Sequence, residues 1–149
     1  MDRLNYTIDI HAPIDKVAAT MIDRKTYQEW TKPFSSTSDF EGGWNKGDKI
    51  CFTSLDRNGE KHGMLAEIVE HDPNEFISIH HYGMLQNGKK ITEGPEVAGW
   101  DDAFENYYYE QKDGVTTVRV EVSDDGEYAD HMNKTWPKAL EILKAICEV

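Results

Sequence analysis

Between Phe40 and Ser123 the chain consists mainly of segments in which apolar and polar residues alternate, and this pattern constrains the fold more than any other feature. A period of two is typical of strands that bury one face. In the last such segment Val118 and Val120 share one face, whereas Arg119 and Glu121 share the other. Turn-forming pairs such as Asn-Gly and Asp-Gly separate the segments. The pattern therefore predicts an antiparallel sheet with one buried face and one face in water.

This sheet is predicted to contain about seven strands, with two short helices after the first strand. The first strand is Leu4–Ile10, and apolar positions with helical spacing follow over Ile14–Ile22. A second helical turn carries Tyr27 and Trp30 and ends before Pro33. The remaining strands are a short one at Phe40, then Ile50–Leu55, His62–His71, Phe76–Tyr82, Ala103–Gln111 and Val115–Ser123.

The chain after Ser123 is predicted to form one long amphipathic helix. Asp124-Asp125-Gly126 supplies a stop and a helix cap. Pro137 removes one backbone donor, so the helix either kinks there or begins near Thr135, and the kink is favoured. The apolar stripe of this helix comprises Met132, Trp136, Ala139, Leu140, Leu143, Ile146 and Cys147.

Together these elements predict a single α+β domain spanning residues 1–149. A helix is only about 10 Å across, so one helix cannot fill the concave face of a strongly bent sheet. We therefore expect a cavity between the helix and the sheet. The segment Met84–Asp102 contains several glycines and shows no clear period, and we expect it to be a functional loop or a mobile one. If the cavity holds a ligand, this loop is expected to act as its lid.

Charge and composition exclude several classes of function. The 149 residues carry a formal net charge of -12, so a nucleic-acid backbone or an anionic membrane surface would repel the molecule. The opening residues lack the apolar core of a signal peptide and no run is long enough to span a bilayer, which predicts a cytoplasmic protein. The two cysteines, Cys51 and Cys147, are predicted to be free thiols, and neither a metal site nor another cofactor is expected.

Six motifs are spread along nearly the whole chain: Ile8-Asp9-Ile10-His11-Ala12-Pro13 with Val17, Trp30-Thr31, Phe40-Glu41-Gly42-Gly43 with Gly47-Asp48, Gly63-Met64-Leu65-Ala66-Glu67-Ile68, Pro73-Asn74-Glu75-Phe76-Ile77-Ser78-Ile79 and Thr135-Trp136-Pro137-Lys138-Ala139-Leu140. With these motifs the chain resembles the START-like, or SRPBCC, superfamily, and within it the branch named after the activator of heat-shock-protein-90 ATPase. The superfamily includes lipid-transfer START domains, the birch-pollen allergen and polyketide cyclases. The resemblance implies the helix-grip fold and a cavity closed by the C-terminal helix. It does not imply one activity, since a shared fold hosts unrelated functions.

Mostly aromatic side chains are the candidates for the cavity wall, because rings give large contact areas and their polar tips orient a ligand. Packing of the core alone is the alternative interpretation. The candidate ligand-binding residues are Trp30, Phe34, Phe40, Phe52, His80, Trp100, Phe104, Tyr108, Met132, Trp136 and Leu140.

Acid–base chemistry has three candidates, His80, Glu67 and Tyr108. Adjacent strand residues point to opposite faces, so His80 and His81 cannot both enter one site without a bulge, and a metal site is disfavoured. One of the two is expected to face inward, as a structural histidine or as a base. A carboxylate at Glu67 would act as acid or base in the cavity and would be solvated on the convex face.

The leading hypothesis is a protein that binds a small hydrophobic or aromatic molecule beneath the Met84–Asp102 loop. One alternative is an enzyme of the cyclase or hydrolase type that uses the same cavity. The other is a chaperone-related or different protein-interaction module without a ligand, since a basic protein partner remains compatible with the acidic surface. No Ser-His-Asp order, phosphate-binding glycine loop or activated-cysteine signature supports nucleophilic catalysis.

Overall fold

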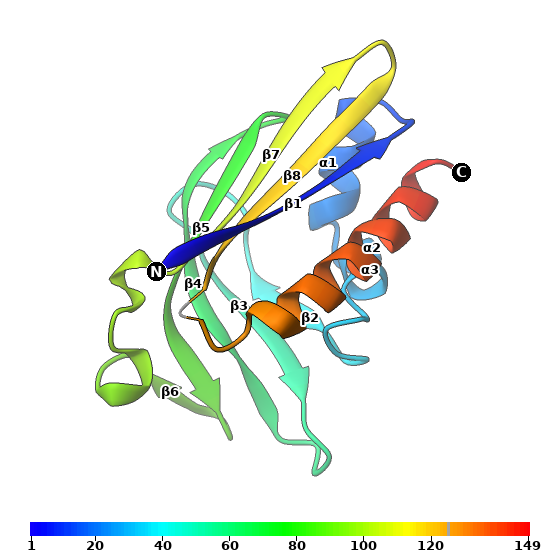
Figure 1. Cartoon of the computed structure of the whole chain (residues 1–149). Helices are drawn as coiled ribbons and strands as arrows, with labels where there is room; N and C mark the ends of the chain where they lie inside the picture. Colours follow the sequence, from blue (N-terminus) through cyan, green and yellow to red (C-terminus); the bar gives the residue numbers. More distant parts are fainter. Residues whose placement is uncertain (125) are drawn as a thin grey trace.

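A computed structural model describes residues 1–124 and 126–149 of the chain (Figure 1). Most elements up to Asp124 are strands, and the chain ends in a long helix. In chain order the elements are β1 (Asp2–Ile10), α1 (Ile14–Ile22), α2 (Arg24–Trp30), β2 (Asp39–Gly42), β3 (Lys49–Leu55), β4 (Lys61–Asp72), β5 (Phe76–Gln86), β6 (Lys89–Ile91), the 3-10 turns η1 (Pro95–Val97) and η2 (Trp100–Asp102), β7 (Phe104–Lys112), β8 (Val115–Asp124) and α3 (Ala129–Cys147).

The strands form one curved antiparallel sheet in the order β1-β8-β7-β5-β4-β3-β2, with β6 paired to β5 beside this path. All three α-helices lie on the same side of the sheet, and α3 runs across it (Figure 1). The predicted α+β architecture is confirmed, including the two short helices after the first strand. The seven expected strands are present, and β6 is an additional eighth.

Local sequence explains several of the boundaries. In the β7–β8 hairpin Asp113 and Gly114 have φ values of 53° and 79°, which suits the two-residue turn that matches strand twist. Between the two short helices Asp23 serves both ends: its backbone N–H donates to the Ala19 carbonyl, and its side chain accepts from the Thr26 N–H. The chain therefore turns between α1 and α2 without leaving these end groups unpaired.

The core lies between the helices and the concave face of the sheet. Val118 and Val120 of β8 are fully buried there, as are Leu143 of α3 and Met21 of α1. The indole Nε1 of Trp30 donates to the Met21 carbonyl oxygen at 3.2 Å. These side chains fill the space beneath the C-terminal half of α3, so any hollow lies toward its N-terminal end.

The long helix differs in detail from its prediction. It begins at Ala129 and continues through Pro137, so the alternative start near Thr135 is wrong. Its N-cap is Tyr128, whose backbone N–H donates to Oδ1 of Asp124 at 3.3 Å. Asp125, the middle residue of the predicted cap, lies outside the described residues. The described helices, α3 included, are too short or too polar to cross a membrane.

The segment expected to be an irregular loop is partly ordered into strands. β5 continues beyond Tyr82 to Gln86, and β6 pairs with its end, so Met84 lies opposite Ile91. Asn87 and Gly88 have φ values of 51° and 78° and make the turn between the two strands. The irregular part is thus confined to the η1 and η2 region.

Candidate functional site

A cavity of about 470 Å³ lies between the sheet and the N-terminal half of α3. Its volume is within the usual range for small-molecule pockets. The wall is contributed by α2, α3, the η2 turn and strands β3, β4, β5, β7 and β8. The lining residues are Met1, Tyr27, Trp30, Thr31, Phe34, Ser35, Ser38, Phe52, Thr53, Ser54, Gly63, Met64, His81, Met84, Trp100, Ala103, Phe104, Glu105, Tyr107, Val122, Ser123, Asp124, Tyr128, Met132 and Trp136.

Trp136 of α3 packs against several of the aromatic rings around this cavity. Its ring centroid lies 4.9 Å from that of Phe34 in an edge-on arrangement and 5.9 Å from that of Trp30. On the other sides it lies 6.5 Å from the Tyr107 ring and 6.3 Å from the Tyr6 ring. Such pairs add to the stability gained from burial, so the ring is held in a fixed orientation.

A polar cluster interrupts the apolar wall where β5 and β7 lie side by side. Glu105 accepts a hydrogen bond from the Tyr107 hydroxyl at Oε2. Its other oxygen, Oε1, lies 3.4 Å from Nε2 of His81. The Nδ1 atom of His81 is buried and has no hydrogen-bond partner among the described residues. Carboxylate, imidazole and phenol thus meet at one point of the cavity wall.

Burial keeps two tyrosine hydroxyls protonated here, that of Tyr107 in the cluster and that of the nearby Tyr27. Burial raises the pKa of Tyr107 well above its ordinary value, and the nearby Glu105 carboxylate adds to the shift. Burial likewise raises the pKa of Tyr27, again with a contribution from Glu105. Both hydroxyls therefore remain hydrogen-bond donors across the neutral pH range.

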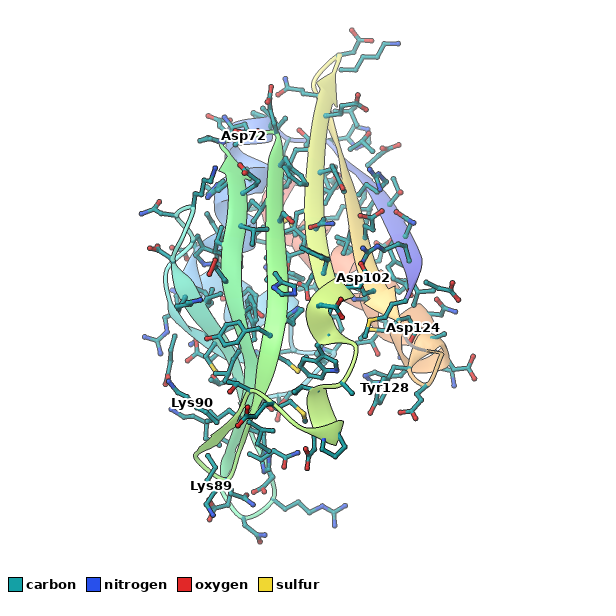
Figure 2. The ribbon with its side chains drawn as sticks, turned by 90° about the vertical axis from the view of Figure 1, so that its left-hand side faces the viewer. Asp72, Lys89, Lys90, Asp102, Asp124 and Tyr128 are labelled. Carbon is teal, nitrogen blue, oxygen red and sulfur yellow. The ribbon has the colours of Figure 1, made fainter. Side chains whose placement is uncertain are left out.

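Among the described residues, the carboxylate side chains in the wall have no lysine or arginine beside them in the lining, and the charged amino group of Met1 is paired with Asp102. Glu105 and Asp124 both line the cavity, whereas no lysine or arginine side chain does so in the part of the chain that the structure describes. Asp124 is 7 % exposed and Glu105 keeps 20 % of its side chain accessible. In Figure 2 Asp124 and Tyr128 lie at the junction of β8 and α3, while Lys89 and Lys90 lie at the β5–β6 hairpin.

The mouth of the cavity lies near the chain start. Met1 and Tyr128, both in the wall, are 42 % and 57 % exposed. Next to them, Asp102 accepts from Arg3 Nη2 at 2.7 Å and from the amino terminus at 3.2 Å. The η2 turn that carries Trp100 is therefore fastened to β1 at the rim.

Seven of the eleven candidate ligand residues line the cavity: Trp30, Phe34, Phe52, Trp100, Phe104, Met132 and Trp136. Phe104 lies at the edge of the wall, since its ring centroid is 4.8 Å from that of His80. Phe40 and Leu140 are not part of the lining and pack in the buried core instead.

His80 and Tyr108 are placed on the convex face, opposite to the cavity. The guanidinium carbon of Arg119 lies 3.9 Å from the centroid of the Tyr108 ring. Nε2 of His80 pairs with the carbonyl oxygen of Trp100 at 2.9 Å. The expectation that one of the two adjacent histidines faces inward holds, but the inward one is His81.

Glu67 is solvated on the same convex face. Its Oε1 accepts from Nζ of Lys49 at 2.7 Å, and this hydrogen bond lowers the pKa of the carboxyl group. The candidate acid–base set His80, Glu67 and Tyr108 therefore does not converge in the cavity. This corrects the sequence-based assignment of His80 and Tyr108 to the cavity face, whereas the solvated position was one of the two alternatives predicted for Glu67.

Tyr27, His81, Glu105 and Tyr107 line the cavity, although they were not predicted from the sequence. For Glu105 and Tyr107 the sequence does contain a signal that indicates their face of the strand. The two-residue Asp113-Gly114 turn places Tyr107 opposite Val120 and Glu105 opposite Val122, and residues directly opposite share a face. For His81 no simple signal exists, because the β4–β5 register shifts between Leu65 and Ala66.

No protein-family model matches the sequence, and no curated protein matches it either. Solved structures do match. The Aha1 dimer from Colwellia psychrerythraea gives a TM-score of 0.72 at 21% identity, with 100% of this chain and 98% of that chain covered. Together with the covering helix and the curved sheet, this match decides the architecture. The chain has the helix-grip fold.

Other helix-grip structures agree with it. Protein Ms6760 from Mycobacterium smegmatis is similar at a TM-score of 0.70 and 15% identity, over 97% of this chain and 89% of that one. DynU16, a protein of the dynemicin biosynthetic locus, is similar at 0.70 and 14% identity, over 100% of this chain and 48% of that one. Such identities establish a shared helix-grip fold, and the function has to be argued from the cavity itself.

Proposed function

We propose that the protein binds a small hydrophobic or aromatic molecule in the cavity beneath α3. The observation that carries this proposal is the hollow of about 470 Å³ in a wall of aromatic rings and methionines. A well-formed apolar pocket with a few convergent polar groups is the usual form of a ligand site. The η2 turn contributes Trp100 to the cavity wall at the rim, which supports a covering role for this end of the 84–102 segment.

Tryptophan fluorescence provides a direct test. Trp30, Trp100 and Trp136 line the cavity, whereas Trp44 lies outside the lining. A guest of about 12 non-hydrogen atoms that gains about 0.5 kcal/mol per atom would bind with a Kd of tens of micromolar. The panel should contain aromatic and aliphatic molecules of neutral, cationic and anionic type.

We expect at least one member of the panel to give a saturable change. Replacing Trp100 by Phe should reduce the amplitude, and the matched Trp44→Phe variant should leave it unchanged. If no compound gives a saturable response, the binding proposal is wrong.

One observation favours an enzyme as the second candidate function: His81 and Glu105 form an imidazole–carboxylate pair in the cavity wall. In ester hydrolysis His81 would take the proton of an attacking water and return it to the departing alkoxide oxygen, while the water oxygen bonds to the carbonyl carbon. Hydrolysis of 4-nitrophenyl acetate tests this. His81→Gln should abolish turnover and the neighbouring His80→Gln should retain it; a wild-type rate equal to that of buffer rejects the enzyme.

A protein-interaction role has less support. The Colwellia structure is of a dimer, which favours self-association. However, the exposed large apolar residues of the described chain form no broad patch: Met1 and Tyr128 lie together at the mouth of the cavity, whereas Leu55 lies beside Thr37 and Val149 beside Lys16. Sedimentation that gives the mass of a single chain at high concentration would exclude a stable dimer.

A further inference from the structure

We infer that Glu105 forms a head-group site in the cavity, selective for guests whose polar end donates a hydrogen bond and carries no negative charge. The guest class is therefore an apolar body with a hydroxyl or ammonium group, rather than a fatty acid or another carboxylate. This inference rests on the proposed ligand-binding function and names the chemistry of its guest.

Glu105 is held with its carboxylate at the cavity wall and with acceptor capacity left over. A carboxylate has room for about four hydrogen bonds. One oxygen accepts from Tyr107, and the other has only the 3.4 Å contact with His81. Since 20 % of the side chain remains accessible, a guest in the cavity reaches the unused positions.

The charge of Glu105 is incompletely balanced. His81 compensates it only when the imidazole is protonated, and no lysine or arginine among the described residues lines the cavity. A buried charge is costly unless it is paired and hydrogen-bonded. A donor on the guest, and an ammonium group above all, supplies the missing partner.

His81 lies beside the less occupied oxygen of Glu105. It lines the cavity, and its Nε2 is 3.4 Å from Glu105 Oε1, which is the long end of the hydrogen-bond range. A guest hydroxyl that reaches Oε1 therefore also comes close to Nε2, and it can donate to the carboxylate and accept from or donate to the imidazole.

An anionic guest meets the opposite situation. Glu105 and Asp124 both lie in its path, and the molecule as a whole carries a formal net charge of -12. Like charges in a site that is partly shielded from water repel strongly. The same apolar body should therefore bind much more weakly when it ends in a carboxylate.

The test uses three naphthalene probes that differ only at the polar end: hydroxymethyl, aminomethyl and carboxymethyl. Isothermal titration calorimetry at neutral pH measures each Kd with the wild-type protein, with Glu105→Gln, and with the control Glu121→Gln. Glu121 lies on the convex face of the adjacent strand β8, where it accepts from Asn106 and Tyr108. It is thus a matched carboxylate outside the cavity.

We expect the alcohol and the amine to bind the wild-type protein at least about tenfold more tightly than the carboxylate. Glu105→Gln should weaken amine binding and strengthen carboxylate binding, each by about tenfold, and Glu121→Gln should change neither. If the wild-type protein binds the carboxylate as well as the amine, the head-group inference is wrong and the binding proposal stands. If no probe binds, the binding proposal is wrong too. The wild-type ranking decides the matter even if Glu105→Gln does not fold.

Discussion

Trp136 is expected to serve stability and ligand binding together, and replacing it by Ala separates the two when Leu143→Ala is measured beside it. Trp136 is 3 % exposed and its ring packs against four other rings. Leu143 is fully buried on the same helix but does not line the cavity. Both variants remove buried atoms from α3, and only one removes part of the cavity wall.

The magnitude follows from what each truncation leaves behind. Replacing a buried Trp by Ala usually costs about 3–5 kcal/mol. Because the space left by Trp136 joins a cavity that already exists and opens near Tyr128, we expect the lower end, about 3 kcal/mol. For a chain of this length that corresponds to a decrease in Tm of about 6–12 °C. Leu143→Ala should cost a similar amount, since its side chain is enclosed.

Guanidinium chloride unfolding followed by circular dichroism gives both free energies, with an unchanged m-value as the check on two-state behaviour. Binding of the hydroxymethyl naphthalene probe should weaken at least about tenfold in Trp136→Ala and stay unchanged in Leu143→Ala. A stability loss below about 1 kcal/mol in Trp136→Ala would refute the packing argument. Equal affinities in the two variants would refute the assignment of Trp136 to the ligand site.

Three further outcomes follow from the same structure. Ser54→Phe places a ring into the cavity from β3, because Ser54 lines the cavity and shares a strand face with Phe52. Denaturation should show a stability change within about 1 kcal/mol while calorimetry shows binding lost; a larger destabilisation would mean that the space beside Ser54 is filled. Tyr108→Ala should lower the free energy of unfolding by about 1–2 kcal/mol through loss of its convex-face contacts and leave probe affinity unchanged, so weaker binding would contradict its placement. Hydrogen bonds from Arg24 lower the pKa of Asp39 to about 2. The pair therefore stabilises the fold above about pH 4 and loses this contribution as the pH falls toward 2, so Asp39→Asn should cost about 0.5–1 kcal/mol at pH 7 and nothing at low pH in denaturation curves; a gap independent of pH would disprove the ion pair.

The elements of the fold follow from the sequence because hydrophobic period and turn chemistry act locally. The strand at Val118 and Val120 and the stripe around Leu143 lie where their spacing predicts. β6 has only three residues, Lys89–Ile91, too few to show an alternation, so it could be recognised only from its pairing with β5.

The candidate site depends on which face of each strand is inward, and that is harder to read. In β7 three consecutive tyrosines, Tyr107, Tyr108 and Tyr109, hide the alternation. The hairpin register resolves it, because Val120 on the next strand is buried and lies opposite Tyr107. For His81 the register shift between β4 and β5, at which Tyr82 of β5 is left unpaired, removes such a shortcut, since strand pairing across a bulge depends on tertiary packing.

The central claim is that a guest enters the cavity under α3, and the methionine methyl groups report on it directly. Met64, Met84 and Met132 line the cavity, whereas Met21 is fully buried in the core and absent from the lining. With protein labelled at these methyl carbons, carbon–proton NMR spectra recorded during titration with the hydroxymethyl naphthalene probe should show saturable shifts for Met64, Met84 and Met132 and none for Met21. Unchanged resonances for Met64, Met84 and Met132 at saturating probe would contradict the account.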